Sequence, residues 1–77
     1  MVRIEKIEVT DKVARYMYFP EKSEQSGIVA LDRATGEWSA EKRLDEYDSA
    51  YISHALRRIE KFQRDGNFLE KDVVVWY

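Results

Sequence analysis

Five side chains that carry, or can take up, a positive charge recur at helical spacing in the second half of the chain. Their positions follow i, i+3, i+4, i+7 and i+10, so a helix would present them on one face. They are His54, Arg57, Arg58, Lys61 and Arg64. Such a stripe can contact phosphate groups or an acidic partner protein, so nucleic-acid binding through this basic helix face is one hypothesis. A solvated face is the simpler interpretation, because bases near a helix C-terminus also favour the helix dipole.

His54 is the only histidine in the sequence, and its surroundings do not favour a catalytic role. At about 100° per residue it falls opposite the apolar stripe of the same segment, among arginine and lysine side chains. A general base needs a positioned partner and a substrate pocket, and the sequence indicates neither. We therefore expect a solvated surface histidine.

Three carboxylates lie close together in sequence, at Asp45, Glu46 and Asp48, and could suggest a site for a hard cation. Calcium sites take at least about six oxygen ligands from a dedicated loop, and no EF-hand spacing is present. Acids at the start of a helix already have a structural use, with Asp48 as the candidate N-cap. The sequence predicts helix capping and no bound metal.

Signatures of catalysis and of cofactor binding are absent from the sequence. It holds no cysteine, and its three glycines stand far apart at positions 27, 36 and 66, so no glycine-rich phosphate loop exists. No serine or threonine lies in a nucleophile motif. We therefore expect a protein that is not an enzyme and that binds no cofactor.

Composition and charge favour one small domain over residues 1–77, near the size at which a single core is just sufficient. The net charge of −2 argues against a nucleic-acid binder held by overall charge, although residues 49–66 carry four bases against two acids. The first twenty residues contain no apolar targeting segment, and the terminal run of five apolar residues is far shorter than a membrane span. A cytoplasmic protein without membrane contact is the expectation.

Four strands are expected before residue 45. The alternation in residues 2–9 changes phase near Glu5 and Lys6, which predicts a β-bulge. The next strand covers residues 13–19 and is followed by a polar loop. Residues 27–32 and 37–44 read as a hairpin, in which Gly36 takes a positive φ.

From Asp45 to Gly66 the apolar period becomes that of a helix, with acids in its first turn, bases in its last turn and glycine just past its end. Its apolar stripe consists of Ile52, Ala55, Leu56, Ile59 and Phe62. Residues 72–77 then form a terminal strand, whose place in the sheet the sequence leaves open. The fold class is therefore α+β, in the order β-β-β-β-α-β. It has a single sheet of about five strands, antiparallel or mixed, with one amphipathic helix packed on one face.

One helix cannot cover both faces of such a sheet. We expect an uncovered aromatic face, and small soluble domains rarely leave a large apolar patch in water. The residues proposed for this face are Tyr16, Tyr18, Val74 and Trp76, with Ala14, Ile28 and Ala30 beside them. The leading hypothesis is a protein-interaction module that forms a homodimer, or binds another protein, through this face. Partial curling of the sheet and half-exposed tyrosines stay open as alternatives. So does a third function, an enzyme site or small-ligand pocket between the helix and Trp38.

Overall fold

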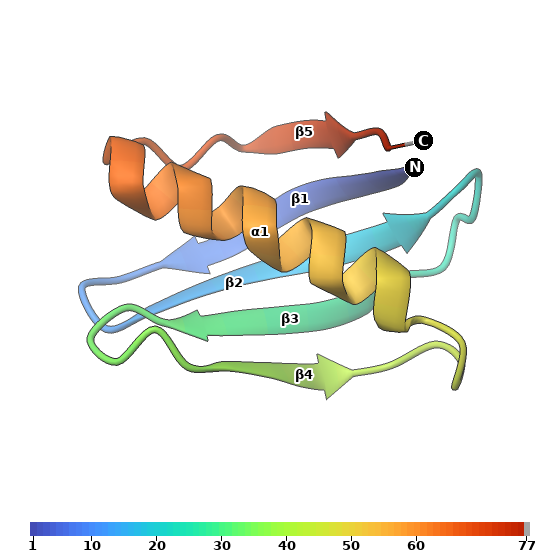
Figure 1. The fold of residues 1–77 in the computed structure, drawn as a ribbon, viewed down its shortest axis with the longest axis horizontal. Helices are drawn as coiled ribbons and strands as arrows, with labels where there is room; N and C mark the ends of the chain where they lie inside the picture. The colour runs from blue at the N-terminus through green and yellow to red at the C-terminus, as the bar shows by residue number, and fades with distance from the viewer. Residues whose placement is uncertain (77) are drawn as a thin grey trace.

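The computed structural model describes residues 1–76, which form five strands and one helix in the expected order (Figure 1). The elements are β1 (Val2–Val9), β2 (Val13–Pro20), β3 (Gly27–Asp32), β4 (Trp38–Lys42), α1 (Ser49–Asp65) and β5 (Lys71–Val74). The predicted α+β class is confirmed. Tyr77, which was expected to end the terminal strand, lies outside the described residues.

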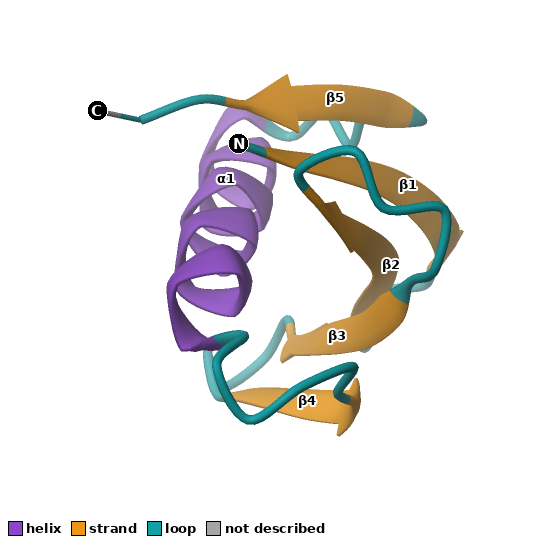
Figure 2. Cartoon of the chain, turned by 90° about the vertical axis from the view of Figure 1, so that its right-hand side faces the viewer, coloured by secondary structure: helices purple, strands orange, loops and turns teal. Residues whose placement is uncertain are grey.

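The sheet has the order β4-β3-β2-β1-β5, and every neighbouring pair is antiparallel. The terminal strand thus returns beside the first strand, with Val74 opposite Val2, so the sheet is not mixed. Figure 2 shows the sheet curving around α1, with the helix filling the concave side. β4 and β5 remain the two edges of the sheet.

The predicted bulge in β1 is present, at Ile7. Lys6 lies opposite Tyr16 and Glu8 opposite Arg15, so Ile7 is an extra residue without a partner in β2. The extra residue reverses the facing of the strand, which is why Val9 packs on the core although its parity differs from that of Ile4.

The β3–β4 hairpin turns as its sequence predicts. Gly36 has a φ of 80°, and its N–H donates to the carbonyl of Asp32 over 2.8 Å. The Asp32 carboxylate accepts the N–H groups of Thr35 and Ala34, and these bonds lower the pKa of Asp32 below its ordinary value. The turn is therefore closed by local hydrogen bonds.

The helix buries the five residues of its predicted stripe against β1, β2, β3 and β5. The sheet face beneath it is not the one expected. Tyr16 and Tyr18 are fully buried there, and Val74 is buried with them, so the prediction of an uncovered face containing these residues is wrong.

The register between β2 and β3 explains this correction. Tyr16 lies opposite Val29, so the tyrosines share the face of Val29 rather than that of Ile28 and Ala30, which do lie on the side away from the helix. That outer face also carries Arg15, which binds the carboxylates of Glu8 and Glu41. Burying this charge would be costly, whereas the tyrosine face is largely apolar.

Both tyrosine hydroxyls have acceptors that allow their burial. Tyr16 donates to the carbonyl of Leu69 over 2.6 Å, and Tyr18 donates to the carboxylate of Asp48 over 2.6 Å. Burial, the larger cause, raises the pKa of each to about 12, and the nearby carboxylate adds to the rise for Tyr18.

Asp48 stands at the N-cap position of α1, but its side chain does not cap the helix. Its Oδ2 instead accepts the N–H groups of Leu44 and Asp45, at 2.8 and 3.1 Å, besides the Tyr18 hydroxyl. The predicted capping role is therefore wrong, and Asp48 ties the β4–α1 loop to the core. At the other end, Gly66 closes the helix with a φ of 70°, as expected.

Within residues 1–76, no helix is long and apolar enough to cross a membrane.

Candidate functional site

A groove runs between α1 and β4 on the concave side of the sheet. In Figure 1 the helix crosses the sheet diagonally, with its C-terminal end beside β5. α1 packs on the other four strands, and β4 extends beyond its cover. The space beside β4 has a volume of about 320 Å³. This is where the third of the sequence-based hypotheses placed a pocket.

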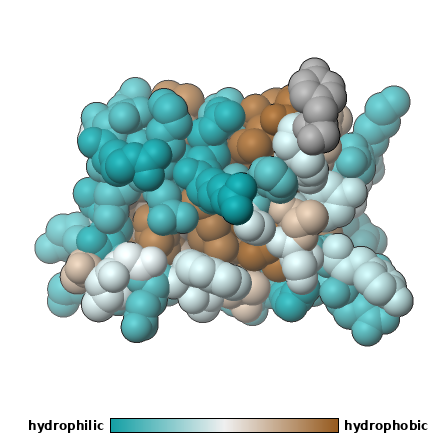
Figure 3. Space-filling model, viewed as in Figure 1, coloured by the Kyte–Doolittle hydropathy of each residue, from teal (hydrophilic) through white to brown (hydrophobic). Residues whose placement is uncertain are grey.

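The floor and one wall of the groove are apolar. Ile52 and Leu56 of α1 are buried and face Ala40 of β4, which is half-buried. Trp38 forms the wall at the start of β4, and 58% of its surface is exposed. Figure 3 shows apolar surface in this hollow, below the polar outer face of the helix. An indole exposed to this extent beside an apolar floor leaves apolar surface that no other part of the described chain covers.

The rim of the groove is polar and holds more positive than negative charge. Arg43, directly after β4, donates to the hydroxyl of Ser49 in the first turn of α1 over 3.3 Å. Ser53, Arg57 and Glu60 follow along the exposed side of the helix. Two guanidinium groups and one carboxylate thus border an apolar floor.

Comparison of the chain with protein-family models, with curated proteins and with solved structures gives no match.

Of the rim residues of α1, Arg57 was singled out from the sequence, whereas Ser49, Ser53 and Glu60 were missed, although the spacing of the four carries a signal. Ser49, Ser53, Arg57 and Glu60 recur at i, i+4, i+8 and i+11, directly beside the apolar stripe. Small and charged residues at that border mark the side of a helix that is next to a sheet but not covered by it. The signal becomes readable only once the position of β4 is known.

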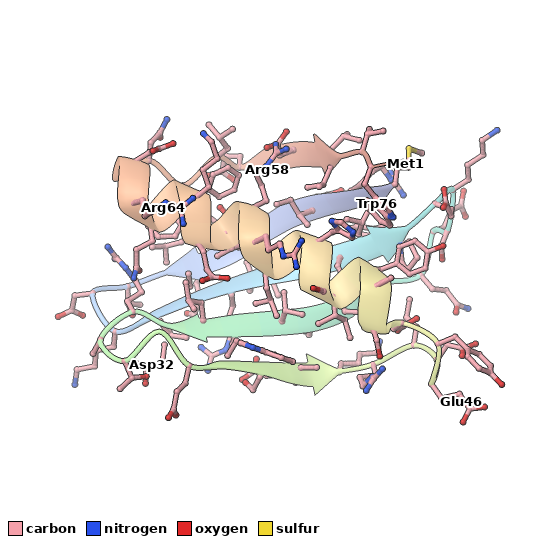
Figure 4. All side chains as sticks on the ribbon, viewed as in Figure 1. Met1, Asp32, Glu46, Arg58, Arg64 and Trp76 are labelled. Atoms are coloured by element: carbon pink, nitrogen blue, oxygen red, sulfur yellow. The ribbon has the colours of Figure 1, made fainter. Side chains whose placement is uncertain are left out.

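Trp76 lies against the helix and not on the far side of the sheet (Figure 4). Its ring stacks on that of His54 with centroids 3.9 Å apart and an angle of 11° between the planes, and it meets Tyr51 edge-on at 5.7 Å. The predicted placement of Trp76 beside uncovered tyrosines is therefore wrong. His54 is half-buried under this ring, so the prediction of a solvated histidine is also wrong.

The predicted basic stripe is divided among different neighbours. Arg58 donates to Asp72 of β5 over 2.5 Å, and Lys61 pairs with Asp65 over 2.8 Å. Figure 4 shows Arg58 directed toward the β5 side of the helix. Among residues 1–76, Arg57 and Arg64 form no ion pair. Of the stripe, Arg57 alone borders the groove.

The three carboxylates before the helix do not converge on a common point. Asp48 turns inward to Tyr18, while an Asp45 oxygen accepts the N–H of Tyr47 over 2.9 Å. Within the described part of the chain, no group of three or more histidine, cysteine, aspartate and glutamate side chains is arranged to hold a metal ion.

Proposed function

We propose that this chain is a non-enzymatic protein-interaction module whose binding site is the groove between α1 and β4. The observation that carries the proposal is the exposed indole of Trp38 beside the apolar floor formed by Ile52 and Leu56. Tryptophan and arginine are the residues most enriched among those that dominate binding energy at protein interfaces, and the groove offers both.

The size of the groove favours side chains of a partner protein over a large cofactor. Its volume of about 320 Å³ is at the lower end of the range of ligand pockets, roughly 300–1,000 Å³. One or two large apolar side chains would fill it and would cover Trp38.

The charges on the rim favour an acidic partner. Arg43 and Arg57 lie along the groove, and each can bind a carboxylate with two parallel hydrogen bonds. The carboxylate of Glu60 would repel an acidic ligand at its own position. The preferred ligand is therefore a short segment with a leucine or aromatic side chain next to aspartate or glutamate.

The side chains of the groove support binding rather than catalysis. Its hydroxyl groups belong to Ser49 and Ser53, and Ser49 accepts a hydrogen bond from an arginine. An arginine cannot activate a serine as a nucleophile, because it does not accept a proton. A cytoplasmic location, expected from the sequence, remains part of the proposal.

Selection from a random peptide library displayed on phage tests the proposed function. We expect selected peptides to combine large apolar residues with acidic ones. Their affinity should fall about 30-fold for Trp38→Ala, the effect of losing roughly 2 kcal/mol at an interface hot spot. Arg57→Glu should weaken the same peptides through charge repulsion.

Tyr47→Ala is the matched control, because Tyr47 is an exposed aromatic residue outside the groove, with 79% of its surface accessible. It should leave the affinity unchanged. Peptides that bind Trp38→Ala as well as the unaltered chain would refute the proposal. Salt-sensitive binding of a labelled oligonucleotide that is lost in Arg57→Ala/Arg64→Ala would favour nucleic-acid binding instead.

A further inference from the structure

Exposed apolar side chains concentrate along one edge of the sheet. Within residues 1–76, six large apolar side chains are exposed, and apart from Trp38 and Tyr47 all of them lie on or near β5. They are Ile7 (45% exposed), Leu69 (41%), Val73 (46%) and Val75 (55%). Ile7 belongs to this group because the preceding residue, Lys6, donates its N–H to Glu70, next to Leu69. This edge is on the opposite side of the sheet from the groove.

The backbone of β5 offers hydrogen-bonding groups along this edge. The bond from the N–H of Lys6 to the carbonyl of Glu70, 2.8 Å long, sets the phase of the β1–β5 ladder. Alternate residues therefore direct their backbone groups toward β1, namely Glu70, Asp72 and Val74. The backbone groups of Lys71 and Val73 point away from the sheet, where a further strand could bind them.

The two edges of the sheet differ in how they are protected. β4 carries an irregularity at Glu41, which has no partner in β3, and bulges and charges on an edge strand discourage pairing with another strand. β5 pairs with β1 without irregularity, and its sequence continues from Asp72 with three valines. A regular, valine-rich edge is the kind to which another strand adds.

One donor on this edge has a partner within the chain. The N–H of Val73 donates to Oδ1 of Asp72 over 2.8 Å, and Oδ2 of the same carboxylate binds Arg58. A pairing strand would supply a carbonyl in place of this carboxylate oxygen. Asp72 would keep its ion pair with Arg58, so one hydrogen bond is exchanged for another.

We propose that a second copy of this chain pairs antiparallel along β5, with the twofold axis at Val74. This register sets Val73 opposite Val75 of the second copy, and places no like charges opposite one another. A register centred on Asp72 would set two carboxylates against each other and is disfavoured. The homodimer expected from the sequence is thereby assigned to the β5 edge instead of the buried tyrosines, and it is independent of the groove.

Sedimentation velocity over a range of concentrations up to millimolar tests this interface. The unaltered chain should pass from monomer to dimer as its concentration rises. Val73→Lys should weaken the dimer at least about tenfold, because an edge lysine opposes pairing. Val73→Thr, which keeps the β-branched shape, should dimerise like the unaltered chain. A chain that stays monomeric at every concentration, or a dimer unaffected by Val73→Lys, would overturn the proposal.

Hydrogen exchange gives a second readout that does not depend on mass. In the dimer, the amides of Val73 and Val75, which this register pairs across the interface, should exchange more slowly than in the dilute monomer, while the amides of β4 should not change. Trp38→Ala, which alters only the groove, should dimerise normally. Protection that appears at β4 instead would place the interface on the other edge and refute the assignment to β5.

Discussion

At the scale of single residues, Tyr18 accounts for the identity of two of its neighbours. Its ring lies so close to Gly27 that a Cβ added there would be 2.2 Å from a ring carbon. Its hydroxyl binds Asp48, which is itself buried. A glycine and an aspartate far apart in sequence are thus both required by one aromatic side chain.

Gly27→Ala should destabilise the protein, because the ring of Tyr18 must move to admit the methyl group. Overpacking of this kind costs about 1–3 kcal/mol in the free energy of unfolding, measurable by urea denaturation. Gly36→Asn is the control, since Gly36 is needed for its positive φ, which asparagine tolerates, and nothing lies within 4 Å of its added Cβ. Equal losses in the two variants would contradict the steric explanation.

Tyr18→Phe removes a hydrogen bond to a buried carboxylate and should lower the free energy of unfolding by about 1.5–3 kcal/mol. Tyr51→Phe makes the same chemical change at the surface, where the hydroxyl meets Glu21 over 3.2 Å, and should cost well under half as much. Both variants lose a hydrogen bond to a carboxylate, so the difference between their free energies of unfolding, measured by thermal or urea unfolding, reports the effect of burial on that bond. A Tyr18→Phe variant as stable as the unaltered protein would show that this bond is unimportant.

At the scale of elements, the start of α1 depends on a loop contact and not on a helix cap. The Asp48 carboxylate binds the backbone of Leu44 and Asp45, which precede the helix. It thereby holds the β4–α1 connection against the sheet and sets where the helix begins. The same connection positions Arg43 and Ser49 at one end of the groove.

Asp48→Ser distinguishes the two roles, because serine is a good N-cap but is too short to replace a carboxylate that accepts three hydrogen bonds. We expect Asp48→Ser to lose about as much stability as Asp48→Ala, with both measured by urea denaturation. If Asp48 acted as an ordinary N-cap, serine would preserve most of the stability and only alanine would cost about 1 kcal/mol.

At the scale of the whole molecule, two tyrosines connect the sheet to the segments on either side of the helix. Tyr16 binds the carbonyl of Leu69 after α1, and Tyr18 binds Asp48 before it. Both hydroxyls must stay protonated to donate these bonds. The stability of the folded protein is therefore sensitive to high pH.

Stability should be constant up to about pH 10 and should fall as the pH rises toward 12. Burial raises the folded-state pKa of Tyr16 and Tyr18 from 10.0 to about 12, so the unfolded chain loses these protons first and is favoured in that interval. Urea midpoints measured across this range test the prediction. The double variant Tyr16→Phe/Tyr18→Phe, which lacks both hydroxyls, is the control and should show a weaker dependence on pH in this interval. An equally steep decline in that variant would show that Tyr16 and Tyr18 do not cause the effect.

The sequence by itself determined those features that depend on neighbouring residues. The bulge in β1, the turn at Gly36 and the helix end at Gly66 follow from local alternation and from backbone torsion angles. The apolar stripe of α1 matches the buried residues of the helix, because a 3.6-residue period identifies one face without reference to any other element.

Only the tertiary structure decided which face of the sheet the helix covers and where β5 lies. Alternation divides a strand into two faces but does not say which face is inside. The register of β2 against β3 decided this, because it places Tyr16 opposite Val29. The acceptors that permit burial of the tyrosines come from residues 30 and 53 positions away. The groove beside Trp38 exists because the diagonal helix does not cover β4, and the edge at Val73 is open because β5 is the last strand of the sheet. Both are properties of the assembled fold and of no local pattern.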